Sequence, residues 1–364
     1  MAGGGASAGE PVGADEWAQR FEQQAQACAE LGSPLYGRLL RLISSEVRSR
    51  GATWDVVATH DRLRFGQAGP LRLVGAAHRL ALGGDAPAWA ALLPSCGGRV
   101  PDSDDALLVA WRDLVGQHGR QLVAGLDREV QTNEVGRAAA LALGIAETRY
   151  PEVRLVEIGC SGGLNLRLDR FSVDLGGIVL GDAASPVELR PEIHGHLGGL
   201  RHHGLTLPRI DERVGIDPHP VDPTTDDGRL TLMSFIWPDQ EQRFQRVAGA
   251  IDIAATTPAE ILGSSGGDAD TAATLARVLS RGGPTVVQHS IVWQYVPTDV
   301  RWRITEVMED AGREASVTEP LAWLRHEPDD WDRRRVAVWL RTWPHGGDRL
   351  VAHADYHGRW ISPV

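Results

Sequence analysis

The residues with the clearest chemical potential lie in one short stretch, 155–166, where a strand-like run meets a group of small residues. The acid Glu157 interrupts an otherwise β-branched and aliphatic run, and glycines then precede an apolar pattern at helical spacing. This order predicts a buried parallel strand, a tight turn and a helix that begins over a ligand. Glycine suits such a turn because it adopts positive φ and lets a ligand approach the backbone. The N–H groups of the turn and the positive end of the helix suit an anionic or carboxylate-bearing group.

Three kinds of site use a strand, a glycine turn and a helix, and the residues fit them unequally. The dinucleotide pattern G-x-G-x-x-G needs glycine at Ser161 and Leu164, so it fits poorly. The hydrolase elbow G-x-S-x-G fits letter for letter, with Ser161 as the nucleophile. The acid-x-G-x-G-x-G loop of S-adenosylmethionine (SAM) methyltransferases matches at Glu157, Gly159 and Gly163, with Ser161 replacing the middle glycine.

Glu157 favours the methyltransferase interpretation over the hydrolase. A carboxylate in an apolar strand is costly to bury without a partner. The ammonium group of SAM would supply that partner, whereas a hydrolase gives the acid no role, and a merely structural turn stays open as an alternative. The residues expected to hold the cofactor in this stretch are Glu157, Gly159, Ser161, Gly162, Gly163 and Asn165.

Two further acids are expected to complete the nucleoside site. Asp217 ends a second apolar run, and an acid at the end of the second strand of a nucleotide-binding sheet accepts hydrogen bonds from ribose hydroxyls. Its distance along the chain from the glycine turn exceeds the usual ~20 residues. A glycine-rich insertion over 172–209 would account for the difference. Asp268 precedes a helical pattern and is expected either to meet the adenine amino group or to cap that helix.

His289 is the first candidate for proton transfer. It ends the strong apolar run 284–290, and ligands of open α/β sheets bind beyond the carboxyl ends of the strands. Histidine is also the side chain best suited to proton transfer near neutral pH. A structural histidine that is hydrogen-bonded at the strand end is the competing interpretation.

The polar stretch 129–137 supplies two more candidates, Asn133 and Glu134. The spacing predicts a helix that places Gln131, Glu134 and Arg137 on or beside one face and leads directly into the central strand. Such a face could line a substrate cleft, with Asn133 and Glu134 orienting or deprotonating an acceptor. A solvated face with helix charge pairs is the alternative.

A histidine-rich region in the insertion raises the question of a metal. His-x-His followed by His-His could hold an ion, but no acidic residue or cysteine completes a recognisable ligand spacing. We therefore expect a surface insertion and no metal site. The four residues concerned are His194, His196, His202 and His203.

These residues require an α/β fold to position them. Residues 1–14 are expected to form a disordered tail, and 15–150 a helical N-terminal domain without strands. Over 151–364 the pattern predicts a Rossmann-like, methyltransferase-type, mostly parallel sheet that ends in an antiparallel hairpin. A serine hydrolase would need several strand–helix units and an oxyanion segment before its elbow, and the helical first part offers neither. That alternative would use His289 or His353 as base.

Composition limits the partners. The 364 residues carry a formal net charge of −11, which argues against nucleic acid and favours a small-molecule or peptidic substrate. The basic residues are all arginine, so lysine Schiff bases and P-loop lysines are excluded. The three cysteines form no C-x-x-C pair. With neither a secretory signal nor a membrane-spanning apolar run in view, we expect a cytoplasmic protein.

Several runs together resemble a bacterial family catalogued as domain of unknown function 2332. These runs are Ser33-Pro34-Leu35-Tyr36, Gln131 to Arg137, Glu157 to Leu166, Asp169-Arg170-Phe171, Ser234 to Gln240, and His289-Ser290. They extend over nearly the whole chain apart from the tail. The resemblance implies a methyltransferase-like sheet and brings no substrate or catalytic residue with it, so the expected function rests on the fold. The leading hypothesis is a SAM-dependent methyltransferase. The alternatives are the serine hydrolase and a non-catalytic protein that binds a nucleoside ligand.

Overall fold

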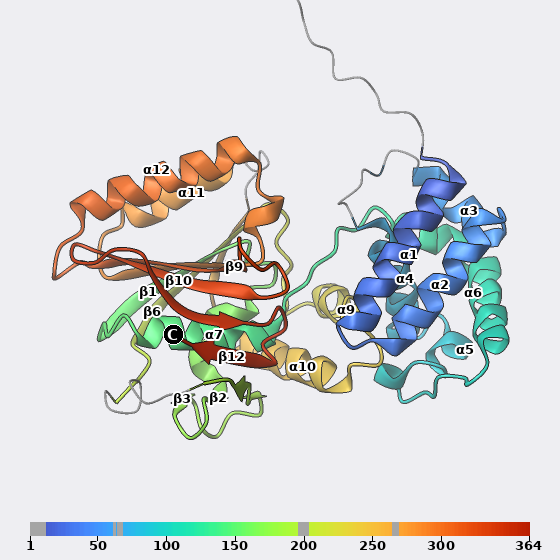
Figure 1. The fold of residues 1–364 in the computed structure, drawn as a ribbon, viewed down its shortest axis with the longest axis horizontal. Helices are drawn as coiled ribbons and strands as arrows, with labels where there is room; N and C mark the ends of the chain where they lie inside the picture. Colours follow the sequence, from blue (N-terminus) through green and yellow to red (C-terminus); the bar gives the residue numbers. More distant parts are fainter. Residues whose placement is uncertain (1–11, 61–62, 64–67, 196–203, 264–268) are drawn as a thin grey trace, which may run out of the picture. The chain divides into compact units, whose positions relative to one another are not determined.

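The structure is a computed structural model of the whole chain (Figure 1). It describes residues 12–60, 63, 68–195, 204–263 and 269–364. Within these residues no helix has both the length and the apolar character needed to cross a membrane.

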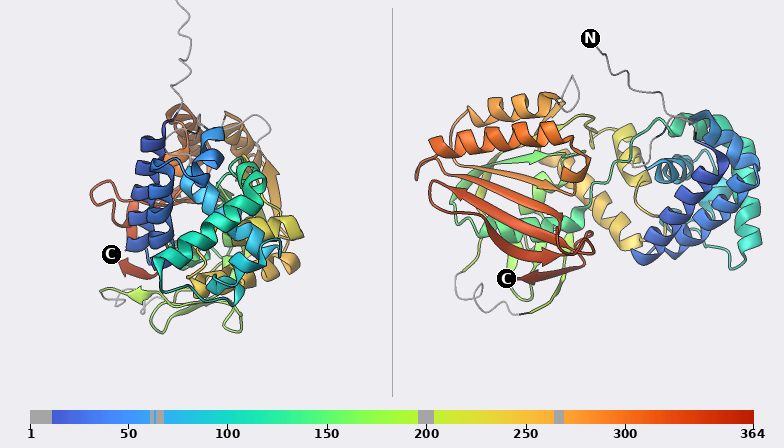
Figure 2. Two further views of the ribbon diagram at one scale, coloured as in Figure 1. Left: turned by 90° about the vertical axis from the view of Figure 1, so that its right-hand side faces the viewer. Right: turned by 45° about the horizontal axis from the view of Figure 1, so that its top comes forward.

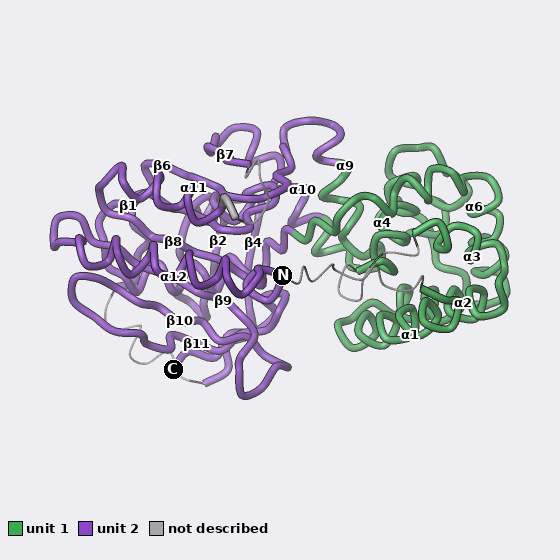
Figure 3. The backbone as a smooth tube through the Cα atoms, turned by 90° about the horizontal axis from the view of Figure 1, so that it is seen from above, with its two compact units in different colours: residues 1–132, 230–244 green, residues 133–229, 245–364 purple. Residues whose placement is uncertain are grey.

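Backbone contacts divide the chain into two compact units (Figure 3). Unit 1 consists of Met1–Thr132 and Leu230–Phe244, and unit 2 of Asn133–Arg229 and Gln245–Val364. The helical unit thus takes a segment from the middle of the sequence, which a division at residue 150 would leave with the sheet.

Unit 1 is helical, as its three- and four-residue apolar spacing predicts. Its first long helices pack against each other around a core that contains Trp17, Phe21 and Trp111. Ser33 caps α2 by accepting a hydrogen bond from the backbone N–H of Tyr36 at 3.2 Å. Its helices are α1 (Ala14–Glu30), α2 (Pro34–Arg48), α3 (Ala52–Val57), η1 (Ala58–His60), α4 (Gly69–Leu82), α5 (Pro87–Ala90), η2 (Pro94–Cys96) and α6 (Asp104–Gly125).

The apolar run 230–236 is mostly helical and ends in unit 1. Helix α9 (Asp226–Ser234) enters this unit and α10 (Glu241–Thr256) leaves it. Between them, Asp239 accepts hydrogen bonds from the Ser33 hydroxyl at 2.6 Å and the Leu35 N–H at 2.8 Å. Two of the sequence runs that carry the family resemblance therefore meet in a helix cap, which is a structural role.

Unit 2 contains a nine-stranded sheet in the order β5-β12-β11-β10-β9-β8-β1-β6-β7. The strands from β7 to β9 are parallel, and β9 to β12 form an antiparallel meander. This confirms the Rossmann-like α/β sheet and the antiparallel C-terminal hairpin. The strands are β1 (Glu152–Ile158), β5 (Glu192–Ile193), β6 (Arg209–Asp217), β7 (Glu260–Gly263), β8 (Thr285–Ser290), β9 (Leu321–Pro328), β10 (Val336–Trp343), β11 (Arg349–Ala354) and β12 (Trp360–Pro363).

The order of the parallel strands reverses between β1 and β8. From β1 the chain builds outward through β6 to β7, and then returns to add β8 and β9 on the other side. In open α/β sheets ligands bind beyond the carboxyl ends of the strands at such a switch point. The segments that follow Ile158 and Ser290 therefore define the place to look for a site.

Helices cover both faces of the sheet (Figures 1 and 2). On one face lies α7 (Ala138–Ala146), where a Cβ on Gly144 would come within 2.4 Å of the Leu324 side chain on β9. On the other lie α11 (Ala269–Leu279) and α12 (Thr298–Glu314), which share an apolar core with alternate residues of the strands, among them Ile158 and Trp323. Alternation along each strand therefore decides which face a polar side chain meets.

The insertion that was expected to be a surface excursion is partly built into the sheets. It forms a small sheet of β3 (Val179–Gly181), β2 (Ser172–Asp174) and β4 (Glu188–Leu189), and β5 extends the large sheet by pairing with β12. His194 stacks on Trp360, with the ring centroids 5.2 Å apart. His196, His202 and His203 lie outside the described residues.

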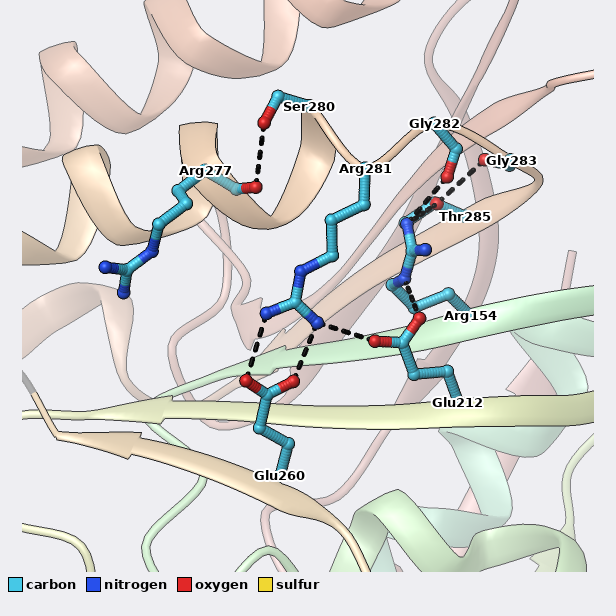
Figure 4. Close-up of polar contacts among 9 residues, drawn as sticks. All are labelled: Arg154, Glu212, Glu260, Arg277, Ser280, Arg281, Gly282, Gly283 and Thr285. Carbon is cyan, nitrogen blue, oxygen red and sulfur yellow. Dashed lines mark hydrogen bonds and ion pairs between the residues drawn. The ribbon is translucent and has the colours of Figure 1, made fainter.

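An ion network ties the strands together near their amino ends, at the edge opposite the switch point (Figure 4). Arg281 pairs with Glu212 at 2.6 Å and with Glu260 at 2.7 Å. Arg154 pairs with Glu212 at 2.5 Å and donates to the Gly282 carbonyl at 2.8 Å. The network links β1, β6, β7 and the segment before β8, so it braces the sheet that carries the site.

Candidate functional site

The glycine turn forms where the sequence predicts it, directly after β1. Gly159, Ser161 and Gly163 have φ angles of 69°, 52° and 64°, in the left-handed region that favours glycine. A Cβ on Gly159 would lie 2.4 Å from the Val292 side chain, so the protein's own packing also requires this glycine. The helix that follows is η4 (Leu164–Arg170), a short 3₁₀ helix rather than a long α-helix.

Most N–H groups of the turn are bonded within the protein. The Ser161 N–H donates to Asp217 Oδ2 at 2.7 Å, Gly163 to the Cys160 carbonyl at 2.7 Å, and Leu164 to Asn133 Oδ1 at 3.2 Å. The turn therefore differs from the expected cradle of N–H groups for an anion. It is a rigid corner whose peptide groups are held from several sides, including bonds from Arg167 to the Gly162 and Gly163 carbonyls.

Asp217 lies at this corner, as its position at the end of the second strand suggested. Its Oδ2 accepts from Ser161, and its Oδ1 accepts from the His219 N–H at 2.9 Å. Residues 56 positions apart in the chain are thus brought into direct contact. Asp268, the other acid expected to contact the nucleoside, lies outside the described residues.

The helix predicted over 129–137 does not form, and this part of the prediction is wrong. Residues 129–134 have no regular structure, η3 covers Val135–Arg137, and α7 begins at Ala138. The physical reason is tertiary. Glu134 is extended and caps η3 by accepting a hydrogen bond from the Gly136 N–H, and the side chain of Asn133 is bonded to the glycine turn. Gln131, Glu134 and Arg137 consequently share no helical face.

Asn133 and Glu134 instead hold backbone groups around the turn. The Asn133 amide donates to the Cys160 carbonyl at 2.7 Å while its oxygen accepts from Leu164. Glu134 Oε1 accepts from the Gly136 N–H at 3.0 Å, and its carbonyl accepts from the Asn165 amide at 3.4 Å. The structure brings these residues to the glycine turn, and their observed contacts position it.

Glu157 is buried, at 3% exposure, in the middle of the sheet. It pairs in register with Gly215 on β6 and Gln288 on β8, and its Oε2 has no hydrogen-bond partner. Burial raises the pKa of Glu157 to about 8, although the charges of Arg167 and Arg137 act in the opposite direction. The carboxyl is therefore largely protonated at neutral pH.

Two polar side chains that were not predicted from the sequence, Gln288 and His326, lie on the same face of the sheet as Glu157. Both side chains are fully buried. The two polar atoms of Gln288 and the two ring nitrogens of His326 have no hydrogen-bond partner. Burial, together with the charge of Arg137, lowers the pKa of His326 to about 3, so its imidazole is neutral. Gln288 could have been identified from the sequence, because it is a polar residue within the otherwise apolar run 284–290.

His289 projects to the opposite face, because it follows Gln288 on the strand. Its Nδ1 lies 2.6 Å from Glu327 Oε1, and its ring stacks on Trp293 with centroids 4.7 Å apart. Glu327 also accepts from the N–H groups of Val292 and Trp293, which begin η5 (Trp293–Tyr295). The carboxylate thus orients His289 and leaves Nε2, which has no partner, as the second ring nitrogen. Glu327 was missed because nothing in the sequence links β9 to β8.

His353, the other base considered for a hydrolase, lies with Asp329, at 3.4 Å between Nδ1 and Oδ2. Burial lowers the pKa of His353, as does the nearby Arg335. Among the residues that the structure describes, no group of three or more His, Cys, Asp or Glu side chains is arranged to hold a metal ion.

Comparisons with known proteins place this site in a family. No curated protein and no solved structure matches the chain. The bacterial family DUF2332, described as an uncharacterized protein conserved in bacteria, matches residues 18–362. The match spans both units and includes the glycine turn, Asp217 and His289. The chain therefore belongs to the DUF2332 family.

Proposed function

We propose that the protein is a cytoplasmic SAM-dependent methyltransferase that acts on a small-molecule or peptidic acceptor. The observation that carries the proposal is Glu157, a buried acid with an unpartnered oxygen at the switch point of a Rossmann-like sheet. A buried carboxyl with an unpartnered oxygen is costly unless a further group satisfies it. The ammonium group of SAM would provide one, and ligands of such sheets bind beside it.

The remaining parts of the cofactor follow from the neighbouring residues. Asp217, held against the turn by the Ser161 N–H, would accept the ribose hydroxyls. Gly159, Gly162, Gly163 and Asn165 would line the methionine part. Methyl transfer is an in-line displacement at carbon, so holding the acceptor in line and excluding water supply much of the rate. In this assignment Asp268 would meet the adenine.

The acceptor would approach from the end of β8. His289, oriented by Glu327, is the group best placed to accept a proton from an acceptor nucleophile. Asn133, through its side-chain amide, and Glu134, through its backbone carbonyl, would contribute by fixing the turn against which the methyl donor lies.

Calorimetry with SAM and with its demethylated product tests the proposal. Both ligands should bind the wild type and raise its stability by mass action, by about 2.7 kcal/mol at one hundred times Kd. Asp217→Asn should weaken binding at least tenfold, because an amide accepts fewer hydrogen bonds than a carboxylate. Asp211→Asn, an exposed acid on the same strand, is the matched control and should bind normally. Absence of binding by either ligand would refute the proposal.

A serine hydrolase is the second candidate, favoured by one observation. Ser161 has φ of 52° between glycines, and a strained serine after a strand is the hallmark of the nucleophile elbow. Labelling by a fluorophosphonate probe that is lost in Ser161→Ala would establish this candidate instead. SAM binding without transfer to any acceptor would indicate the third possibility, a non-catalytic nucleoside-binding protein.

A further inference from the structure

Buried polar side-chain atoms without hydrogen-bond partners gather on the face of the sheet that α7 covers. Glu157, Gln288 and His326 belong to the neighbouring strands β1, β8 and β9, and the register sets them on one face. We call these three residues the α7-face cluster. Their unpartnered atoms are Glu157 Oε2, Gln288 Oε1 and Nε2, and His326 Nδ1 and Nε2.

Such a cluster is costly as a purely structural feature. A buried polar group without a partner loses its hydrogen bonds to water and gains none in return. The three side chains are at most 3% exposed, so bulk solvent does not supply partners. Apolar residues of similar volume would pack here without that cost. Groups that stay unsatisfied in the folded chain are expected where a bound molecule satisfies them.

The chemistry of the cluster defines what it would bind. A cationic group bound beside Glu157 would favour the ionised carboxylate and form an ion pair with it. Gln288 and neutral His326 each offer both a donor and an acceptor. The guanidinium of Arg137 donates to the Tyr356 and Ser290 carbonyls and acts electrostatically on both Glu157 and His326. A ligand that fits has a cationic donor group and, a few bonds away, an anionic acceptor group.

We propose that the α7-face cluster binds the zwitterionic end of an α-amino acid. Its ammonium group would pair with Glu157, and its carboxylate would accept from Gln288 and His326 on the side of Arg137. The amino acid could be free, or it could be the methionine end of SAM. The second source rests on the proposed function, and the first does not.

Calorimetry with three probes separates these sources. S-adenosylhomocysteine carries both nucleoside and amino acid, 5′-deoxy-5′-methylthioadenosine lacks the amino acid, and L-methionine lacks the nucleoside. The wild type should bind S-adenosylhomocysteine at least tenfold tighter than methylthioadenosine. Gln288→Met and His326→Phe should abolish that advantage, whereas Gln294→Met, an exposed glutamine in the same unit, should preserve it.

The melting temperature of the ligand-free variants provides a second readout. Gln288→Met and His326→Phe remove unpaired buried groups, so both should melt no lower than the wild type. Clear destabilisation of both would show that the cluster is satisfied internally and would overturn the inference.

Each binding outcome distinguishes this inference from the proposed function. Equal affinity for the two nucleosides would overturn the inference and leave the proposed function standing. L-Methionine binding that depends on Gln288, without binding of either nucleoside, would support the inference and remove the proposed function. If none of the three probes binds, both proposals fail.

Discussion

Glu157 should make the free energy of unfolding of unit 2 depend on pH in an unusual direction. Its pKa is 4.5 in an ordinary environment and about 8 in the folded protein. Between these values the folded state keeps a proton that the unfolded state releases. Stability from this group is therefore complete below pH 4.5 and is lost as the pH rises towards 8.

The size of the effect follows from linkage. Each pH unit between the two pKa values costs about 1.4 kcal/mol, because one pKa unit is worth that much at 25 °C. Integrated for Glu157, the cost is about 0.8 kcal/mol at pH 5 and about 3.3 kcal/mol at pH 7. The group is 3% exposed, so solvent screening reduces this little. Unit 2 should lose about 2.5 kcal/mol from this residue over two pH units.

Glu157→Gln isolates this contribution, because every other titrating group is common to both proteins. The variant should be more stable than the ligand-free wild type, by a margin that grows from pH 5 to pH 7 by about 2.5 kcal/mol. Urea-dependent hydrogen exchange of the β1 and β8 amides reads the opening of unit 2 separately from unit 1. Glu152→Gln, on the same strand but half-exposed, is the control and should show no such growth.

A margin that stays constant between pH 5 and pH 7 would refute the reasoning. It would mean that the Glu157 carboxyl is already ionised in the folded protein, paired with Arg167 or Arg137 more closely than its raised pKa implies. The Glu157 carboxylate would then form an ion pair within the protein, and it would no longer be evidence for a cationic ligand.

Three further variants test the contacts around the glycine turn and the ion network at the amino ends of the strands. Gly136→Ala should cost about 1–3 kcal/mol because its Cβ would overlap the His357 carbonyl, whereas Gly347→Ala, with open space around it, should stay within about 0.5 kcal/mol by urea denaturation. Asn133→Leu leaves the buried N–H of residue 164 unpaired and should cost about 1–3 kcal/mol, with faster exchange of the turn amides. Arg281→Gln should cost less than about 1 kcal/mol per lost pair, because the partners are partly exposed, and the loss should shrink in 1 M salt.

Strands and helices with strong apolar periodicity were predictable, and the contacts that cross between them were not. The apolar runs that became β1, β6 and β8 place Glu157, Asp217 and His289 at strand ends by local pattern alone. Residues 129–137 show the limit. Polar residues three apart resemble a helix face, but the Asn133 side chain is bonded to Cys160 and Leu164, which lie 27 and 31 residues later in the chain. Local propensity carries no information about those contacts.

Contacts between strands also explain why His326 and Glu327 were not predicted as parts of the site. A sequence shows that Gln288 and His289 interrupt an apolar strand, and alternation sends them to opposite faces. It does not show which face carries a neighbouring acid, because that depends on strand order and register. Glu327 and His326, on the next strand in space, became visible as partners only once β9 was known to lie beside β8.

Backbone strain points to the same place as the unpartnered side chains. Ser161 and Ile291 each follow closely on the carboxyl end of a strand at the switch point, with φ of 52° and 53°. For a β-branched residue such as Ile291 this conformation is a genuine outlier, and its N–H is held by the His326 carbonyl at 2.9 Å. Strain of this kind persists only where surrounding contacts impose it, and it concentrates at functional sites. Because Glu157 and His289 project to opposite faces, a molecule that uses both must pass over the carboxyl edge between these two residues. The strained turns after β1 and β8 are the backbone that such a molecule would contact.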